Sequence, residues 1–163
     1  PEDFDAYAGF MADADFTRHI NGAVMARSDA WRSFAYGLGH WVLRGYGFWA
    51  VERKSDGAYL GRVGLSNPEG WPGLEVGWSI GKAYWGNGYA PEAARAARNY
   101  AFLTQPVDRL ISVIAPENLA SQAVARKVGE TRGECTEVVV RGAAHSVDIW
   151  SISREKWQSE THL

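Results

Sequence analysis

The sequence has 163 residues but only one cysteine, and it has neither a long apolar run nor a block of lysine and arginine. A single cysteine, Cys135, excludes an intramolecular disulfide framework and provides no set of thiolates for a structural zinc site, so no metal is expected. A membrane-spanning helix needs about 20 apolar residues, and no run approaches that length. No secretory signal pattern opens the sequence, so we expect a cytoplasmic protein that does not enter a membrane.

Neither sign of charge predominates in the sequence. The chain carries 17 basic and 19 acidic residues, a net charge of −2, which argues against a surface for nucleic acid. A phosphorylated ligand would therefore have to be bound by local geometry. The length, the 46% hydrophobic content and the absence of repeats and linkers predict one domain over residues 1–163.

Hydrophobic periodicity predicts a mixed α/β domain, in which a central sheet is flanked by helices. Residues 1–31 are helical but irregular, and a second helix follows Ser28 as its cap, with Trp31, Phe34, Leu38 and Val42 at helical spacing. The expected strands cover 48–52, 59–65, 74–80, 109–114, 134–140 and 146–152, with a Pro- and Gly-rich loop at 66–73. Further helices are expected from Pro91 to before Pro106, from 118 to 128, and at 154–157.

A glycine-rich turn connects the strand at 74–80 to the helix that Pro91 is expected to open. It reads Trp85-Gly86-Asn87-Gly88-Tyr89-Ala90. The first N–H groups of a helix lack internal partners, and glycines let a diphosphate approach the backbone closely. The segment lacks the Gly-Lys-Ser/Thr of a Walker loop and the third glycine of a dinucleotide fold. A plain tight turn remains the alternative.

A second candidate lies 28 residues after Ala90, at Asn118-Leu119-Ala120-Ser121. Asn118 stands where a helix is expected to begin, and Ser121 falls in its first turn. The alternative is structural, because asparagine is a common N-cap and serine is tolerated there.

Together these two segments resemble the GNAT acyltransferase superfamily, whose members have a Q/R-x-x-G-x-G/A turn after the fourth strand and an Asn-x-x-Ser-type helix start after the fifth. The resemblance runs from Phe48 to Trp157 and is strongest to the branch with acetylases of ribosomal-protein N-termini. It implies a mixed, mostly antiparallel sheet that splays open between the fourth and fifth family strands to hold acetyl-CoA.

The resemblance also implies roles for particular residues. Asn118 would bond the pantetheine amide region, and Lys127 or Arg126 would reach the outer phosphate unless they are plain exposed helix charges. The backbone N–H groups of Gly86, Asn87, Gly88, Tyr89 and Ala90 would bind the pyrophosphate. The backbone of Trp78, Ser79 and Ile80 would pair with the pantetheine arm.

Three features depart from the family pattern. Trp85 stands in place of the usual Gln or Arg, and Glu130 follows Gly129 where the family often has an apolar residue. The family usually begins with a strand, whereas this sequence starts at the first helix, so that N-terminal strand is expected to be missing.

Acetyl transfer to an amine needs a base, a polarised carbonyl and a leaving thiolate. Glu75 is the candidate base, or else a structural hydrogen bonder, and a water chain is another route for the proton. The resemblance implies that Ser121 donates to the leaving sulfur, and Tyr84, Tyr89 and Tyr100 are rival acids unless they are plain core or surface residues. A backbone N–H of the fourth family strand would polarise the carbonyl. No histidine stands in a nucleophile motif, so we expect direct transfer from acetyl-CoA to a primary amine.

The acceptor amine is expected between the first two helices, the loop 16–28 and the loop 66–73, with Trp71, Trp41 and Trp49 as walls. It is either a protein N-terminus or a small molecule. Exposed edge strands favour a homodimer. Two other functions remain open, a non-catalytic acyl-CoA-binding or sensing module and a binder of another nucleotide.

Overall fold

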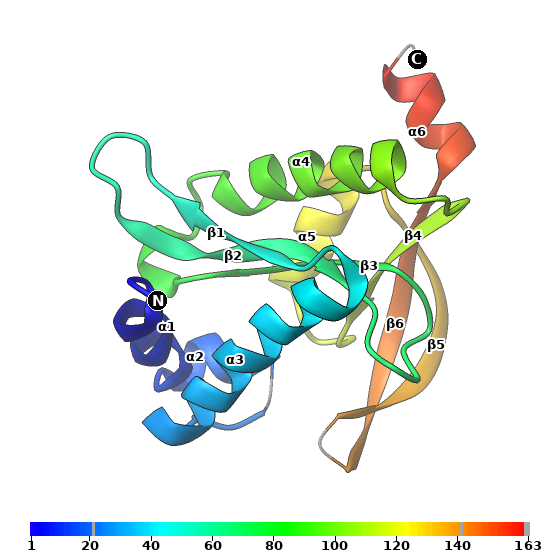
Figure 1. Ribbon diagram of the computed structural model, residues 1–163. Coiled ribbons are helices and arrows are strands. Elements are labelled where there is room, and N and C mark those ends of the chain that lie inside the picture. The colour runs from blue at the N-terminus through cyan, green and yellow to red at the C-terminus, as the bar shows by residue number, and fades with distance from the viewer. Residues whose placement is uncertain (21, 141, 162–163) are drawn as a thin grey trace.

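The computed structural model describes residues 1–20, 22–140 and 142–161, which form one mixed sheet with helices on both faces (Figure 1). The helices are α1 (Phe4–Met11), α2 (Ala14–Thr17), α3 (Arg27–Arg44), α4 (Tyr89–Thr104), α5 (Leu119–Lys127) and α6 (Arg154–Thr161), with a 3-10 turn, η1, at Lys82–Tyr84. The strands are β1 (Phe48–Glu52), β2 (Tyr59–Ser66), β3 (Glu75–Ile80), β4 (Arg109–Ile114), β5 (Thr131–Val140) and β6 (Ala143–Ser153).

The six strands lie in the order β1-β2-β3-β4-β6-β5, and every neighbouring pair is antiparallel except β3 and β4. That parallel pair is connected through α4, because parallel neighbours need a crossover. The predicted fold class, a mixed and mostly antiparallel sheet flanked by helices, is confirmed. Among the described residues, the first strand along the chain is β1, which lies at an edge of the sheet.

Helices α4 and α5 lie on one face of the sheet, and α1 and α3 lie across the other (Figure 1). The largest buried cluster joins β2, β3 and β4 to α4, where Ala94, Ala97 and Ala101 are almost fully buried. These small side chains bring the backbone of α4 close to the sheet, as the alanine pattern indicates. Close packing therefore fixes the start of α4 beside the end of β3.

The structure corrects the expected course of α3. The helix begins at Arg27, and its N-cap is Ala26, with no side-chain cap. Ser28 lies inside the first turn because the extended backbone of Ala26 caps the helix two residues earlier than expected. Trp31, Leu38 and Val42 are exposed, whereas Ala30 and His40 are buried.

Helix α4 also begins earlier than expected, at Tyr89, so Pro91 is its third residue. Proline is tolerated there because N–H groups of the first turn have no partner within the helix.

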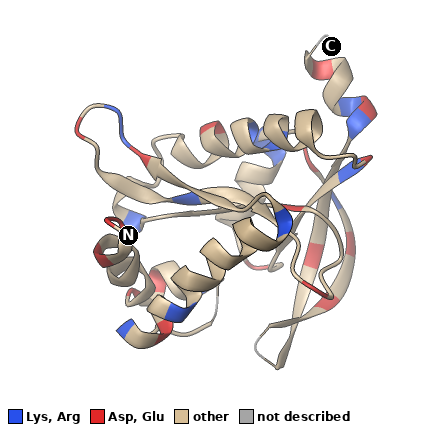
Figure 2. Ribbon diagram, in the orientation of Figure 1, with Lys and Arg blue, Asp and Glu red and all other residues tan. Residues whose placement is uncertain are grey.

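The strands β5 and β6 extend beyond the expected ranges. Basic and acidic residues are interspersed over the ribbon in Figure 2. In the part of the chain described, no helix is long and apolar enough to cross a bilayer.

Candidate active site

Strands β3 and β4 separate after a single paired position. Their register consists of Glu75 opposite Ile111, where the Ile111 N–H donates to the Leu74 carbonyl. At the next residue of β4, the Ser112 hydroxyl donates to the Val76 carbonyl at 2.7 Å, in place of a backbone hydrogen bond. The predicted splay between the family's fourth and fifth strands is therefore present, as the fork between β3 and β4.

Backbone direction alternates along β3, so only some of its groups face this fork. The Leu74 and Val76 carbonyls point to β4, which places Trp78 and Ile80 on the same side. Gly81 donates to Leu60 and Ser79 is paired with Arg62, so the backbone of Ser79 points to β2. Of the three residues expected to meet pantetheine, Trp78 and Ile80 thus face the open edge.

The glycine-rich turn presents free amides at the end of the fork. Gly86 and Gly88 have φ values of +79° and +83°, and a Cβ on either would meet no atom within 4 Å. Within the described segments, the N–H groups of residues 86–90 donate to no backbone or side-chain acceptor. Because they lie at the N-terminus of the long helix α4, they form a site suited to a diphosphate.

Two side chains hold this turn in shape. The Trp85 indole Nε1 donates to the Ile80 carbonyl at 2.6 Å, and the Asn87 amide donates to the Tyr84 and Trp85 carbonyls at 3.1 and 3.0 Å. Trp85 therefore contributes by tying the turn to the end of β3. The Asn87 side chain folds back on the turn, which leaves the backbone N–H of Asn87 as the group available to a ligand.

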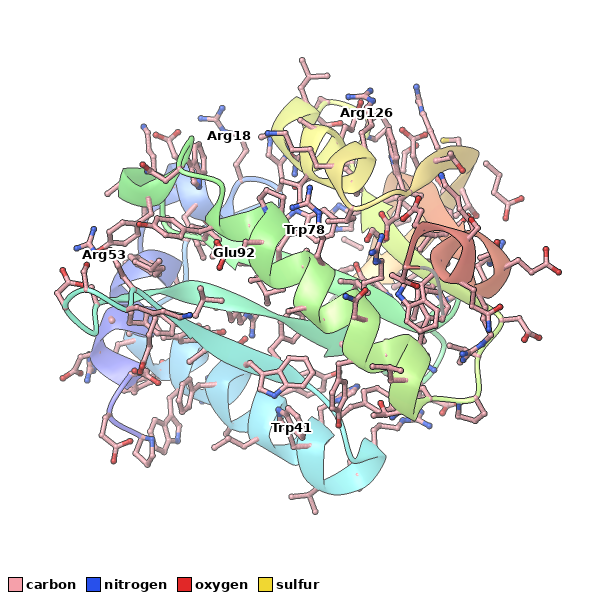
Figure 3. All side chains as sticks on the ribbon, turned by 90° about the horizontal axis from the view of Figure 1, so that it is seen from above. Arg18, Trp41, Arg53, Trp78, Glu92 and Arg126 are labelled. Carbon is pink, nitrogen blue, oxygen red and sulfur yellow. The ribbon has the colours of Figure 1, made fainter. Side chains whose placement is uncertain are left out.

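Asn118 and Ser121 meet at the start of α5, across the fork from β3. Asn118 is the N-cap of α5 and accepts from the Ser121 N–H at 3.1 Å, so the structural alternative holds for its oxygen. The Trp78 indole Nε1 donates to Ser121 Oγ at 3.2 Å, and Trp78 lies between α4 and α5 (Figure 3). Because Ser121 Oγ accepts that bond, its own hydrogen is available to a group in the fork.

Glu75 lies on the opposite face of β3 from Trp78, at the base of the fork. Its Oε1 accepts from the Val113 N–H at 3.2 Å, and its Oε2 accepts from the Trp71 indole Nε1 at 2.8 Å. Burial raises the pKa of Glu75 to about 7, although both hydrogen bonds act to lower it. A partly buried carboxyl with a pKa near neutrality is suited to take a proton from an ammonium.

A second carboxyl, Glu130, is buried on the α4 side of the fork. Its Oε1 lies 2.9 Å from Ser112 Oγ, and its Oε2 is buried without a partner. Burial and, to a smaller extent, the negative charge of Glu75 raise the pKa of Glu130 to about 8, against the lowering effects of Ser112 and Arg98. The single hydroxyl hydrogen of Ser112 lies within hydrogen-bond distance of both the Val76 carbonyl and Glu130 Oε1, and it can be donated to one of them at a time.

One cleft of about 1100 Å³ joins these groups, except that Glu130 lies behind Ser112 and outside the lining. Every predicted site residue lines it except Asn87: Glu75, Trp78, Ser79, Ile80, Gly86, Gly88, Tyr89, Ala90, Asn118 and Ser121. Among the predicted aromatic walls Trp71 lines the cleft, whereas Trp41 and Trp49 pack against each other outside its lining, with ring centroids 5.2 Å apart. Figure 3 shows Trp41 over α3, away from Trp78.

Sequence reasoning missed several residues of this site. The cleft is also lined by Arg62 and by the tips of β5 and β6, including Val138 and His145. The signal for Arg62 was a lone charge within the apolar strand 59–65, and the signal for Glu130 was its departure from the family pattern. In the described portions no three His, Cys, Asp or Glu side chains cluster closely enough to hold a metal ion.

The acetyltransferase (GNAT) domain family matches residues 1–131 of this chain. The chain therefore belongs to the GNAT family, as the two motifs indicate. Two proteins of Bacillus subtilis are similar in sequence. YkkB is 39% identical over 90 residues, 53% of this chain and about half, 52%, of YkkB. The N-acetyltransferase YnaD is 28% identical over 80% of this chain and 75% of its own length.

Solved structures share the fold. An acetyltransferase from Agrobacterium tumefaciens is 29% identical, with a TM-score of 0.79 over 94% of this chain and 86% of its own. RimL, a ribosomal-protein alpha-N acetyltransferase in complex with coenzyme A, has 15% identity and a TM-score of 0.75 over 93% and 89% of the two chains. Spermidine N-acetyltransferase from Vibrio cholerae has the same identity and TM-score, over 96% and 92%.

Proposed function

We propose that this chain transfers an acetyl group from acetyl-CoA directly to a primary amine. The observation that carries the proposal is the set of unpaired amides at residues 86–90, which opens on the same cleft as Glu75. RimL and the spermidine enzyme, which share the fold, are both named as acetyltransferases in complexes with CoA.

The residues present fit coenzyme A. Open space over Gly86 and Gly88 leaves room for a pyrophosphate at the start of α4. The groups of Trp78 and Ile80 that face the fork can bond an extended pantetheine arm as a neighbouring strand would. The side-chain nitrogen of Asn118 has no partner among the described residues and can bond an amide of that arm. Lys127 lines the cleft and can reach an outer phosphate, whereas Arg126 stacks on Trp150.

Bound acetyl-CoA supplies the thioester that is attacked. Glu75, acting directly or through a water, takes the proton that the amine must lose before it attacks. A backbone N–H of β3 at the fork polarises the carbonyl, and the Ser121 hydroxyl donates to the departing sulfur. The amine nitrogen forms the new amide bond to the acetyl carbon as the carbon–sulfur bond breaks, with no acyl-enzyme intermediate.

Replacement of Glu75 by Gln tests the catalytic part of the proposal. The carboxamide keeps the size of the side chain but cannot take a proton, so kcat should fall about 100-fold. The Kd of acetyl-CoA, measured by calorimetry, should stay unchanged. In the wild type kcat/KM should rise with pH through about 7, the pKa of Glu75, because only the deprotonated carboxylate is a base. The variant should lose this rise.

A matched control is Glu92→Gln, an exposed position on α4 outside the cleft lining (Figure 3). This variant should retain wild-type turnover. A chain that binds acetyl-CoA but releases no CoA with any amine in a broad panel would instead be a non-catalytic acyl-CoA-binding module. Greater thermal stabilisation by ATP or NAD than by acetyl-CoA would contradict the proposal at its first step.

A further inference from the structure

Arg62 places a positive charge on the same side of the cleft as Glu75. We call this the acceptor side, because the amine in the proposed reaction must reach Glu75. It lies in β2 opposite Ser79, and side chains alternate along a strand, so Arg62 shares the sheet face of Gly77 and Glu75. Its guanidinium carbon lies 4.7 Å from the centroid of the Phe48 ring and 5.3 Å from that of Tyr7. The two rings fix the side chain in place, and Arg62 lines the cleft.

The carboxylates that line this cleft already have partners. Asp15 pairs with Arg18 and Lys82, and Glu117 lies 3.8 Å from His19. Glu75 accepts hydrogen bonds from Trp71 and Val113. None of these acidic groups is therefore left over to neutralise Arg62.

Arg62 has no carboxylate within ion-pair distance in residues 1–20, 22–140 and 142–161. Its Nε is buried and makes no hydrogen bond. Aromatic rings contact the guanidinium carbon but do not accept the N–H groups at its edge. A buried donor on a cation is costly to leave unpaired, so the arrangement calls for an anion supplied by a ligand.

The spacing suits one molecule that reaches both groups. The Arg62–Ser79 pair lies four residues along β3 from Glu75, about 13 Å between Cα positions at ~3.3 Å per residue. Gly77 lies between them without a side chain, and the Phe48 ring covers it, since a Cβ there would lie 2.9 Å from that ring. Because glutamate and arginine both extend from their strands, their charged ends can face two ends of one acceptor.

We propose that Arg62 binds a carboxylate of the acceptor, so that the acceptor is an amine that also carries a carboxylate. This inference rests on the proposed function and narrows its substrate class. Guanidinium groups bind carboxylates through two parallel hydrogen bonds, which gives both affinity and orientation. A polyamine would place a second positive charge against Arg62 and is disfavoured.

Matched pairs of acceptors test this proposal. One arm compares amino acids of increasing chain length, each with its carboxamide and with a diamine of equal length. A second arm compares short peptides with Glu or Gln next to the free N-terminus, which separates a small-molecule carboxylate from a protein one. Binding to the CoA-saturated protein is measured by calorimetry, independently of turnover, and kcat/KM is measured beside it.

In the wild type, the carboxylated member of at least one arm should bind about tenfold or more tightly than its neutral partner. In Arg62→Met, which keeps the side-chain length and the packing on Phe48, that preference should disappear while the Kd of acetyl-CoA stays unchanged. Arg62→Lys should keep part of it. Arg53→Met, at an exposed pair with Asp56 outside the cleft, should keep all of it.

Equal binding of charged and neutral acceptors by the wild type would overturn the proposal, as would a preference that survives in Arg62→Met. Loss of turnover with every amine, while a carboxylated amine still binds through Arg62, would overturn the proposed reaction and support the Arg62 site. Normal turnover with no carboxylate preference would support the proposed reaction and overturn the Arg62 site.

Discussion

The two sides of the cleft offer different kinds of chemical groups to a ligand. On the side proposed for CoA, the groups offered to a ligand are mostly backbone amides, at residues 86–90 and on the free edge of β3. On the side proposed for the acceptor they are side chains from separate segments, including Arg62 of β2, Trp71 of the loop before β3, and His145 of β6.

This difference determines what each side indicates about its ligand. Backbone amides bind any ligand with the right acceptors, so they define a shared cosubstrate and tolerate changes such as Trp85. Side chains define charge and shape, so they select one acceptor among many. The experiments below separate the two sides, in order of decreasing effect.

The largest effect is expected at Gly88, which has a φ of +83° at the N-cap of α4. Gly88→Val should weaken acetyl-CoA binding by about 100-fold, because a branched side chain disfavours this backbone conformation and intrudes on the amides. Loss of one or two hydrogen bonds to a charged group accounts for a change of this order. Calorimetric titration with acetyl-CoA measures it.

Gly57 provides the matched control for backbone strain. It has a φ of +71° in the turn between β1 and β2, where an added Cβ would also meet no atom within 4 Å, and it lies outside the cleft lining. Gly57→Val should cost similar stability but leave the Kd of acetyl-CoA unchanged. Equal losses of affinity in both variants would mean that backbone strain, and not damage to the amide site at residues 86–90, explains the effect.

A smaller effect is expected at Ser121, the residue proposed to donate to the reacting sulfur. Ser121→Ala should lower kcat roughly tenfold, since one hydrogen bond to the leaving thiolate is lost. The helix should remain intact because Asn118 accepts from the backbone N–H of residue 121, which alanine retains. Single-turnover kinetics measures the chemical step, and an unchanged rate would assign Ser121 only a structural role.

The smallest effect on binding and turnover is expected at Glu130, where the expected change is in stability. Its pKa rises from 4.5 to about 8 on folding, so between these pH values the folded chain holds a proton that the unfolded chain has released. Stability should therefore fall as pH rises through this window, by up to about 1.4 kcal/mol per pH unit from this group. Glu130→Gln should remove that component, while Glu75 contributes a slope of the same sign up to about pH 7.

Urea unfolding at pH 5 to 9 measures this difference. The free energy of unfolding of the variant should decline less with pH than that of the wild type, and the two should differ most at pH 8 and above. Parallel declines would show that Glu130 ionises in the folded protein as it does in the unfolded chain.

Much of the fold and of the CoA side could be predicted from the sequence, because the information there is local. Strand alternation and the turn at residues 85–90 each occupy a short segment whose chemistry is visible in its residue types. Helix starts were less predictable, because the extended backbone of Ala26 and the turn at Gly88, rather than Ser28 and Pro91, set them.

The acceptor side depends on contacts between distant segments, and sequence periodicity does not show these. Arg62 meets Phe48 and Tyr7 only through the folded sheet and α1. On the α4 side of the fork, Glu130 likewise meets Ser112 of β4 only because the residues after α5 pack against that strand. Trp41 and Trp49 were expected as walls, but the Trp49 ring packs against Trp41 and Tyr100 instead.

The central claim is that free amides at the start of α4 bind the diphosphate of acetyl-CoA beside Glu75. Amide-resolved NMR during titration with CoA tests it most directly. Large, saturable shifts are expected for Gly86, Asn87, Gly88, Tyr89 and Ala90, with Gly57 unmoved. Saturable binding of CoA that leaves these five resonances in place would contradict it.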